Sequence, residues 1–221
     1  MALTFTILDW KAWTPARDAQ PDVSVIPAML RRRLSPMGRA ALSVIMPLAC
    51  TYGAMPLVYV SRHGDLSRTL GLLEDLAKGD PLSPTAFSLS VHNATAGLFS
   101  IQQGLTHNIT AIGSDGRELV PGLLESLGLC NTQTPHVLCV FCDEPVPAVY
   151  QQQVDLPVHP YAVALVLGPG RDWQLDFSGD QEGDFPSTPQ ALQLLGLLQG
   201  EGEQLLLGSN GNVWRLSRCA S

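Results

Sequence analysis

The sequence predicts an α/β protein in which helices cover a mixed β-sheet. Short apolar runs suited to strands buried on both faces alternate with Leu- and Ala-rich stretches at helical spacing. The last part of the chain departs from this alternation, because a helix is followed there by two consecutive strands. At 221 residues the chain is long enough to bury a sizeable core, and we expect a single domain over residues 1–221.

The expected strands are short and rich in β-branched and aromatic residues. The first alternates apolar and polar residues, and the later ones are continuous apolar runs. Gly208-Ser209-Asn210-Gly211 separates the last two, which indicates a terminal hairpin. The strands are expected at residues 3–8, 57–60, 108–112, 137–141, 161–167, 172–177, 204–207 and 212–216.

The expected helices carry local start and stop signals. Ser35 precedes Pro36, which is typical of an N-cap followed by the first helical residue. Leu66, Leu70 and Leu73 share one face of a later helix that Gly79 should end. Residues 18–27 are Pro-rich and irregular. The helices are expected at residues 36–50, 65–78, 91–104, 115–127 and 188–198.

Charge is scarce in this chain. Asp, Glu, Lys and Arg make up 15% of it, against roughly 25% in an average soluble domain. Such a surface favours cover by another subunit, so we expect a homo- or hetero-oligomer. The net charge of −7 argues against binding nucleic acid. Arg31-Arg32-Arg33 is the one basic run and is interpreted as a solvated turn or helix end.

No metal, cofactor or membrane segment is expected. The 5 cysteines are odd in number and spread out, which does not indicate a disulfide framework. Cys139 and Cys142 have metal-ligand spacing but fall in one expected strand, where residues three apart point to opposite faces. The uncharged stretch 40–61 is broken by Pro47 and Gly53, so it predicts a helix and a strand. With no secretory signal recognised at Met1, we expect a soluble, cytoplasmic protein.

Residues 81–114 contain no Asp, Glu, Lys or Arg between Pro81 and Ser114, yet they are rich in small polar side chains. An uncharged but hydrogen-bonding segment suits an interface or the lining of a cleft. Its Ser-Pro…Phe…Ser-x-x-Asn-x-x-x-Gly-x-x-Ser-Ile pattern, within residues 83–101, resembles the N-terminal half of β-ketoacyl synthases. These are thiolase-fold condensing enzymes of fatty-acid and polyketide synthesis.

The resemblance implies a thiolase-like fold, here half of a ketosynthase, with an added C-terminal helix and hairpin. It covers roughly residues 57–167. The ending resembles short, stand-alone ketosynthase N-terminal-domain proteins found beside aryl-polyene and fatty-acid-type enzymes. It therefore implies an accessory protein whose partner is an acyl-carrier protein or a ketosynthase subunit.

The nucleophile of that family is a Cys in a strand-to-helix turn, where a helix N-terminus lowers the thiol pKa. Aligning on Gly104 and Gly116 puts Gly113 at that position, and glycine carries no nucleophile. Ser114 is its neighbour, more simply interpreted as a helix N-cap. The last histidine is His159, so the two histidines of the family's C-terminal half are not matched. We expect a non-catalytic protein.

Two enzyme hypotheses remain open beside this one. A thioester hydrolase or acyltransferase would use Ser114 or His92. Arg62-His63-Gly64 follows a strand and also resembles the opening motif of histidine phosphatases, in which the His is phosphorylated and the Arg holds the phosphate. That family places the motif after its first strand, whereas a strand and a helix precede it here.

The candidate binding or interface residues cluster in the uncharged segment. His92 and Asn93 either line an acyl cleft or form hydrogen bonds at a buried helix contact. Ala94, Ala96 and Gly97 are small and predict the close approach of another backbone or an acyl chain. The full set is Ser90, His92, Asn93, Gly97, Ser100 and Gly113.

Overall fold

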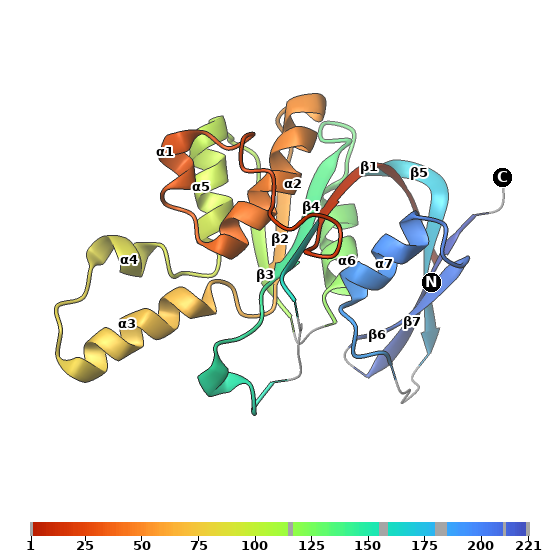
Figure 1. The fold of residues 1–221 in the computed structure, drawn as a ribbon. Coiled ribbons are helices and arrows are strands. Elements are labelled where there is room, and N and C mark those ends of the chain that lie inside the picture. The colour runs from red at the N-terminus through yellow and green to blue at the C-terminus, as the bar shows by residue number, and fades with distance from the viewer. Residues whose placement is uncertain (1, 115–116, 155–158, 180–184, 210, 220–221) are drawn as a thin grey trace.

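A mixed sheet organises the chain, as the sequence predicts. The computed structural model describes residues 2–114, 117–154, 159–179, 185–209 and 211–219. In this described part, a seven-stranded sheet has the order β3-β2-β4-β5-β7-β6, and β1 pairs with β5 (Figure 1). The strands are β1 Ala2–Trp13, β2 Leu57–Ser61, β3 Ile109–Gly113, β4 Val137–Asp143, β5 Tyr161–Gly179, β6 Gln204–Ser209 and β7 Asn212–Arg218.

The centre of the sheet is parallel and buried on both faces. β2 pairs in parallel with β3 on one side and with β4 on the other. Every residue of β2 and of β4 is buried, which explains why both strands appear in the sequence as continuous apolar runs. β5 then pairs antiparallel with β4, so the sheet is mixed.

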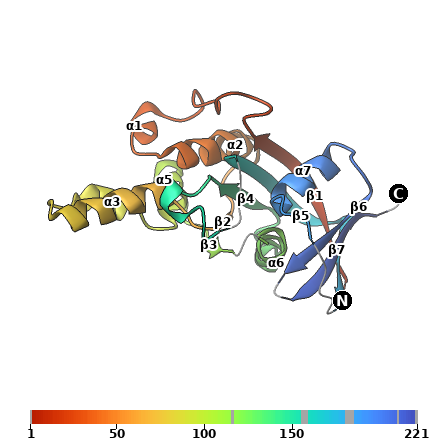
Figure 2. The same ribbon diagram turned by 60° about the horizontal axis from the view of Figure 1, so that its bottom comes forward.

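Helices cover both faces of this sheet. One core layer packs α2 and α5 against the sheet, and the other packs α6 and α7 against the opposite face. Figure 2 shows α2 and α6 on opposite sides of β2 and β4. The helices are α1 Ala28–Arg31, α2 Pro36–Tyr52, α3 Leu66–Lys78, α4 Pro84–Ser88, α5 Ala94–Gln103, α6 Leu119–Leu129, the 3₁₀ turn η1 Ala148–Tyr150, and α7 Gln190–Leu198. None of the helices in the described residues is long and apolar enough to cross a bilayer.

The start of α2 confirms the predicted cap. Ser35 is extended and its Oγ accepts a hydrogen bond from the Gly38 N–H at 3.1 Å, with Pro36 as the first helical residue. The helix continues over Pro47 and ends at Gly53, whose φ of 79° stops it. Two other helices begin later than predicted, α5 at Ala94 and α6 at Leu119. The predicted start of α6 at residue 115 lies outside the described residues.

One long bent strand replaces two predicted ones. The sequence predicts separate strands at 161–167 and 172–177, but β5 runs through both. β1 is longer than predicted and pairs with both halves of β5, across a register shift between Phe5 and Thr6. At Gly170 a β-carbon would overlap Thr6 Oγ1, so only glycine allows the two backbones to approach there. The Gly-Pro-Gly sequence at 168–170 therefore marks a bend and not a strand end.

The α3–α4 arm, residues 66–88, projects from the body of the protein (Figure 1). α3 ends at Gly79 in the left-handed conformation, as predicted. Its leucines share one face, as predicted, yet no residue of α3 is buried. Leu76 is 60% exposed and Phe87, on α4, is 62% exposed. An amphipathic helix with no buried residue has its apolar face available to another molecule.

Two glycines of α6 give a matched test of its packing. A β-carbon at Gly122 would lie 2.5 Å from Phe141 Cε1, whereas one at Gly128 meets nothing within 4 Å. We expect Gly122→Ala to lower the unfolding free energy by about 1–3 kcal/mol through overpacking. Gly128→Ala should instead leave it unchanged or raise it by up to about 1 kcal/mol, because alanine is the better helix former. Chemical denaturation of both variants measures this, and equal effects would contradict the packing described.

Candidate functional site at the carboxyl ends of the parallel strands

The carboxyl ends of the three parallel strands meet at one edge of the sheet. Ser61 ends β2, Gly113 ends β3 and Asp143 ends β4, and Ser61 pairs in register with Gly113. The connection from β2 to β3 carries α5 on one face, and that from β3 to β4 carries α6 on the other. The crossover that leaves β2 and the crossover that leaves β3 therefore run on opposite faces of the sheet, and ligands in open α/β sheets bind where such connections diverge.

Asp143 organises the polar groups at this edge. Its Oδ1 accepts hydrogen bonds from Ser61 Oγ at 2.9 Å and from the Arg62 N–H at 2.8 Å. Ser61 Oγ in turn accepts the Gly64 N–H at 3.0 Å. These bonds fix the turn that follows β2. Burial raises the pKa of Asp143 to about 6, although the Arg62 N–H and the Ser61 hydroxyl favour the carboxylate.

Tyr161 links Asp143 to a second buried carboxyl, Glu118. The Tyr161 hydroxyl lies 3.3 Å from Glu118 Oε1 and 3.3 Å from Asp143 Oδ2. A phenol has one proton, so it donates to one of these oxygens at a time. Burial, together with a smaller effect of the nearby Asp143 charge, raises the pKa of Glu118 to about 7. Ionisation of either carboxyl therefore costs free energy in the folded protein, so the stability of the fold depends on pH.

Glu118 and Gln190 attach α7 to the start of α6. Glu118 Oε1 accepts the Ala191 N–H at 3.1 Å. Gln190 Oε1 accepts the Leu119 N–H at 3.2 Å, and its amide donates to the Gly208 carbonyl at 2.8 Å. The C-terminal helix and hairpin are thus joined to the site by buried hydrogen bonds.

His92 contacts the same turn from the segment before α5. Its Nε2 lies 2.9 Å from the Ser61 carbonyl oxygen, and its ring packs edge-on against Tyr59. A carbonyl only accepts, so Nε2 carries the proton and is not a base for a nearby hydroxyl. Of the two interpretations of His92, this arrangement favours the hydrogen bond at a helix contact.

Gly113 and Ser114 lie on the exposed side of this edge. Gly113 is exposed, and a β-carbon there meets nothing within 4 Å. Ser114 is half-buried. The N-cap of α6 is Glu118, so the helix cap predicted at Ser114 lies four residues further along the chain. A helix N-terminus therefore does not follow directly on Gly113.

The other candidate residues face outward within this chain. The Ser90 and Ser100 hydroxyls bond back to carbonyls of their own turns, Phe87 and Gly97, each at 2.9 Å. Asn93 is exposed and occupies the N-cap of α5 without a side-chain cap bond. Gly97 has open space where a side chain would stand, so the close contact predicted there is not made within the described chain.

The Arg62-His63 turn has acidic surroundings. Asp143 binds the Arg62 N–H, and Asp65 caps α3 and pairs with Arg68 at 3.1 Å. His63 is exposed, and partial burial together with Arg62 and His92 lowers its pKa. These carboxylates disfavour a bound phosphate, which weakens the phosphatase hypothesis.

The two cysteines with metal-ligand spacing lie in the core. Both are buried in β4, Cys139 in the layer with α6 and Cys142 in the layer with α2, so they point to opposite faces as predicted. Burial raises the pKa of the Cys139 thiol to about 12. Within the described residues, no three His, Cys, Asp or Glu side chains are grouped to hold a metal ion.

The sequence interpretation missed the Glu118–Tyr161–Asp143 network. Two positions in the sequence indicate this network. Asp143 ends an apolar run, and Glu118 stands just before a Leu-rich helix, in a chain that has few charges. A carboxylate at the boundary of a buried element must be paired or must shift its pKa.

Comparison with known proteins agrees with the fold. Residues 8–215 match the family described as "Beta-ketoacyl synthase, N-terminal domain", and the chain belongs to this family. The match extends beyond the residues 57–167 that the motifs indicate. No curated protein matches the chain.

Several solved structures of similar fold are ketosynthases. One chain of a complex of the ketosynthase ApeO with its chain length factor ApeC, from Xenorhabdus doucetiae, is 29% identical with a TM-score of 0.86. The match covers 98% of this chain and 100% of that one, so it includes α7 and the hairpin. The ishigamide ketosynthase/chain length factor is 13% identical over 80% of this chain and 68% of that one, with a TM-score of 0.57.

A type II polyketide ketosynthase solved with its acyl-carrier protein, AntDE:AntF, is 12% identical over 89% of this chain and 87% of that one, with a TM-score of 0.58. At that identity the likeness shows the fold alone. The chain is a ketosynthase-like biosynthetic protein with a thiolase-like fold.

The buried carboxyls predict how stability depends on pH. The folded pKa values of Glu118 and Asp143, about 7 and about 6, exceed their ordinary values of 4.5 and 3.8. Their contribution is therefore complete below the ordinary values and is lost as the pH rises through the folded values. We expect the unfolding free energy to fall between about pH 4 and pH 7, by about 3 kcal/mol for each carboxyl.

Glu118→Gln should reduce this slope, because glutamine keeps the acceptor for Ala191 and does not ionise. Glu74→Gln, on the exposed surface of α3, is the control and should retain the wild-type slope. Urea denaturation at a series of pH values measures the effect. A slope that Glu118→Gln leaves unchanged would contradict the assignment.

Proposed function

We propose that this chain is the non-catalytic partner of a ketosynthase in a fatty-acid, polyketide or aryl-polyene pathway. The observation that carries the proposal is Gly113, which stands at the end of β3, where condensing enzymes carry their cysteine. Decarboxylative condensation needs a thiolate to hold the acyl chain, and glycine has no side chain to supply it.

The surroundings of Gly113 support a non-catalytic role. In the family, a helix N-terminus at this turn lowers the thiol pKa and helps to bind the thioester oxyanion. Here α6 begins only at Leu119. The hydroxyl of Ser114 would need a base, and the Nε2 of His92 is engaged with the Ser61 carbonyl. The thioester hydrolase or acyltransferase hypothesis therefore has less support.

The lateral edge of β3, the outermost strand of the sheet on that side, is a suitable docking element. Among the described strands, β3 pairs only with β2, so its other edge is open. Its sequence, Ile109–Gly113, has no charge, no proline and no bulge, which are the usual protections of an edge strand. An open edge of this kind can pair with a strand of another chain.

The apolar surface beside this edge extends the docking area. α5 packs next to β3, and its Ile101 is 78% exposed. The α3–α4 arm, with Leu76 and Phe87 exposed, projects on the same side of the molecule (Figure 1). A ketosynthase is the occupant we propose, since the solved complexes of similar fold pair a ketosynthase with a chain length factor.

An acyl-carrier protein is a second candidate partner. Arg32 and Arg33 are exposed at the end of α1, where a solvated helix end was predicted. Arg68 reaches this turn, donating from Nη2 to the Arg33 carbonyl at 3.2 Å. Such a basic corner, on a chain with a net charge of −7, suits a partner that presents carboxylates or a phosphate.

The protein alone should not condense acyl units. Incubated with acyl- and malonyl-loaded carrier protein, it should give no ketoacyl product by mass spectrometry, and product should appear only when a ketosynthase is added. Turnover by this chain alone, abolished by Ser114→Ala, would favour the enzyme hypothesis instead.

The docking edge predicts a specific loss of binding. Ala111 is exposed in the middle of β3, so Ala111→Lys would place a charge on the edge without disturbing the core. We expect binding to a co-expressed ketosynthase from the same organism to weaken at least about tenfold, or about 1.4 kcal/mol. Ala148→Lys, exposed in η1, is the control and should bind normally.

Sedimentation and calorimetry measure both variants. If Ala111→Lys binds as tightly as wild type, β3 is not the docking edge. If wild type shows no complex with the ketosynthase and is a strict monomer, the proposed function is wrong.

A further inference from the structure

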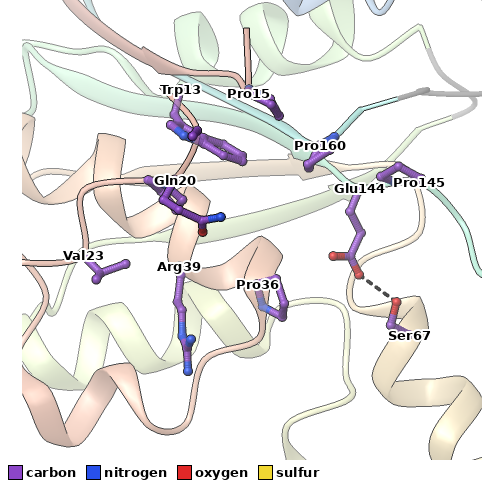
Figure 3. Close-up of a pocket in the computed structure, with 12 residues that line it drawn as sticks. Trp13, Pro15, Gln20, Val23, Pro36, Arg39, Ser67, Glu144, Pro145 and Pro160 are labelled. Carbon is purple, nitrogen blue, oxygen red and sulfur yellow. Dashed lines mark hydrogen bonds between the residues drawn. The ribbon is translucent and has the colours of Figure 1, made fainter. Parts of the chain in front are cut away.

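A cavity of about 580 Å³ lies on the α2 side of the sheet. The loop after β1, the first turn of α2, the start of α3 and the segment after β4 converge on it (Figure 3). Its walls are mainly apolar, with Trp13, Pro36, Pro145 and Pro160 around the opening shown in Figure 3. Its volume falls in the range of roughly 300–1,000 Å³ that is usual for small-molecule sites.

The loop that covers this cavity is held in place. The Trp13 indole N–H donates to the Asp18 carbonyl at 3.1 Å, and the Arg17 and Asp18 N–H groups both bond to the Thr14 carbonyl. The indole N–H is engaged in this bond. Trp13 therefore lines the cavity with the surface of its ring. The loop therefore forms a preformed apolar wall.

Glu144 is the acidic group on the opposite wall. It is half-buried and follows directly on Asp143. Its Oε1 accepts a hydrogen bond from Ser67 Oγ at 3.0 Å, which Figure 3 shows as the contact between the β4 side and α3. Burial raises the pKa of Glu144, with Asp65 adding to the effect. A carboxylate in such a wall is stabilised by a cation.

The described residues do not supply that cation. In the described part of the chain, Glu144 forms no ion pair with a lysine or arginine; Arg68 is paired with Asp65 at 3.1 Å. Arg39 also lines the cavity, but its Nε donates to the Arg31 carbonyl at 3.3 Å, and its side chain extends away from Trp13 in Figure 3. Glu144 thus has one hydroxyl partner and no positive one.

We propose that the Trp13–Glu144 cavity binds a small apolar molecule that carries a protonated amine. The ammonium group pairs with Glu144, and the apolar body lies against the ring of Trp13 and the prolines. The carboxylate of Glu144 suits an ammonium group, and the ring face of Trp13 on the opposite wall suits an apolar body. None of the residues that line the cavity belongs to β3 or α5, although Ser67 lies at the start of the α3–α4 arm.

Three probes that share one alkyl chain test this inference: n-octylamine, 1-octanol and octanoate. Titration calorimetry on the full chain at neutral pH should show octylamine binding at least about tenfold more tightly than octanol, and octanoate more weakly than octanol. Glu144→Gln should abolish the preference for the amine and leave octanol binding unchanged. Glu74→Gln, an exposed carboxylate on α3, removes the same charge elsewhere and should keep the preference.

A second variant tests the same inference in case Glu144→Gln does not fold. Ser67 is exposed, so Ser67→Lys should fold normally and supply an internal cation beside Glu144, which should also abolish amine binding. The inference is overturned if octanoate binds best, if none of the three probes binds, or if the amine preference survives both variants. Loss of ketosynthase binding in Ala111→Lys, with amine binding retained, would separate the two proposals.

Discussion

The burial of β2 and β4 on both faces is the constraint on which the rest of the structure depends. Neither strand has an exposed residue, so helices must cover the sheet on each side. The chain meets this requirement with α2 and α5 on one face and with α6 and α7 on the other. The crossover that leaves β2 carries α5 on one face and the crossover that leaves β3 carries α6 on the other, so the carboxyl end of β2 lies between them. Two buried polar side chains, Ser61 and Asp143, stand at that end.

The polar side chains at the carboxyl ends of the parallel strands form hydrogen bonds that connect elements of the fold. Asp143 fixes the turn after β2, Tyr161 connects it to Glu118, and Glu118 attaches α7. His92 holds the same turn through the Ser61 carbonyl. Such engagement of the described polar groups in structural bonds is in line with the non-catalytic role proposed above. What the chain leaves open is its β3 edge and the apolar arm.

Much of this fold can be predicted from the sequence, because the strongest signals are local. The Ser35–Pro36 cap, the Gly79 stop and the apolar runs of β2 and β4 all have the predicted structure. The motif at residues 83–101 indicates the right family. The misses come from tertiary pairing: β5 continues through Gly168–Gly170 because β1 pairs with it on both sides of the bend. Sequence periodicity likewise predicts the Leu face of α3 but not its exposure.

The candidate site was harder to predict for the same reason. Glu118, Asp143 and Tyr161 are far apart in the sequence, and only the sheet brings them together. Small or uncharged character predicts Ser90, Asn93 and Gly97 as site residues, and in the structure Asn93 is exposed while Ser90 and Gly97 are half-buried. Such residues suit an interface with a second molecule. The pattern of a single chain does not specify what that molecule is.

Hydrogen exchange on the mixture of this protein and a ketosynthase tests the central claim most directly. If the ketosynthase docks on the open edge, backbone amides of Ile109–Gly113 and the outer face of α5 should become protected in the complex. Amides of β4, which are already buried, should change little. Exchange at β3 that is the same with and without the ketosynthase, while a complex forms, would contradict the account.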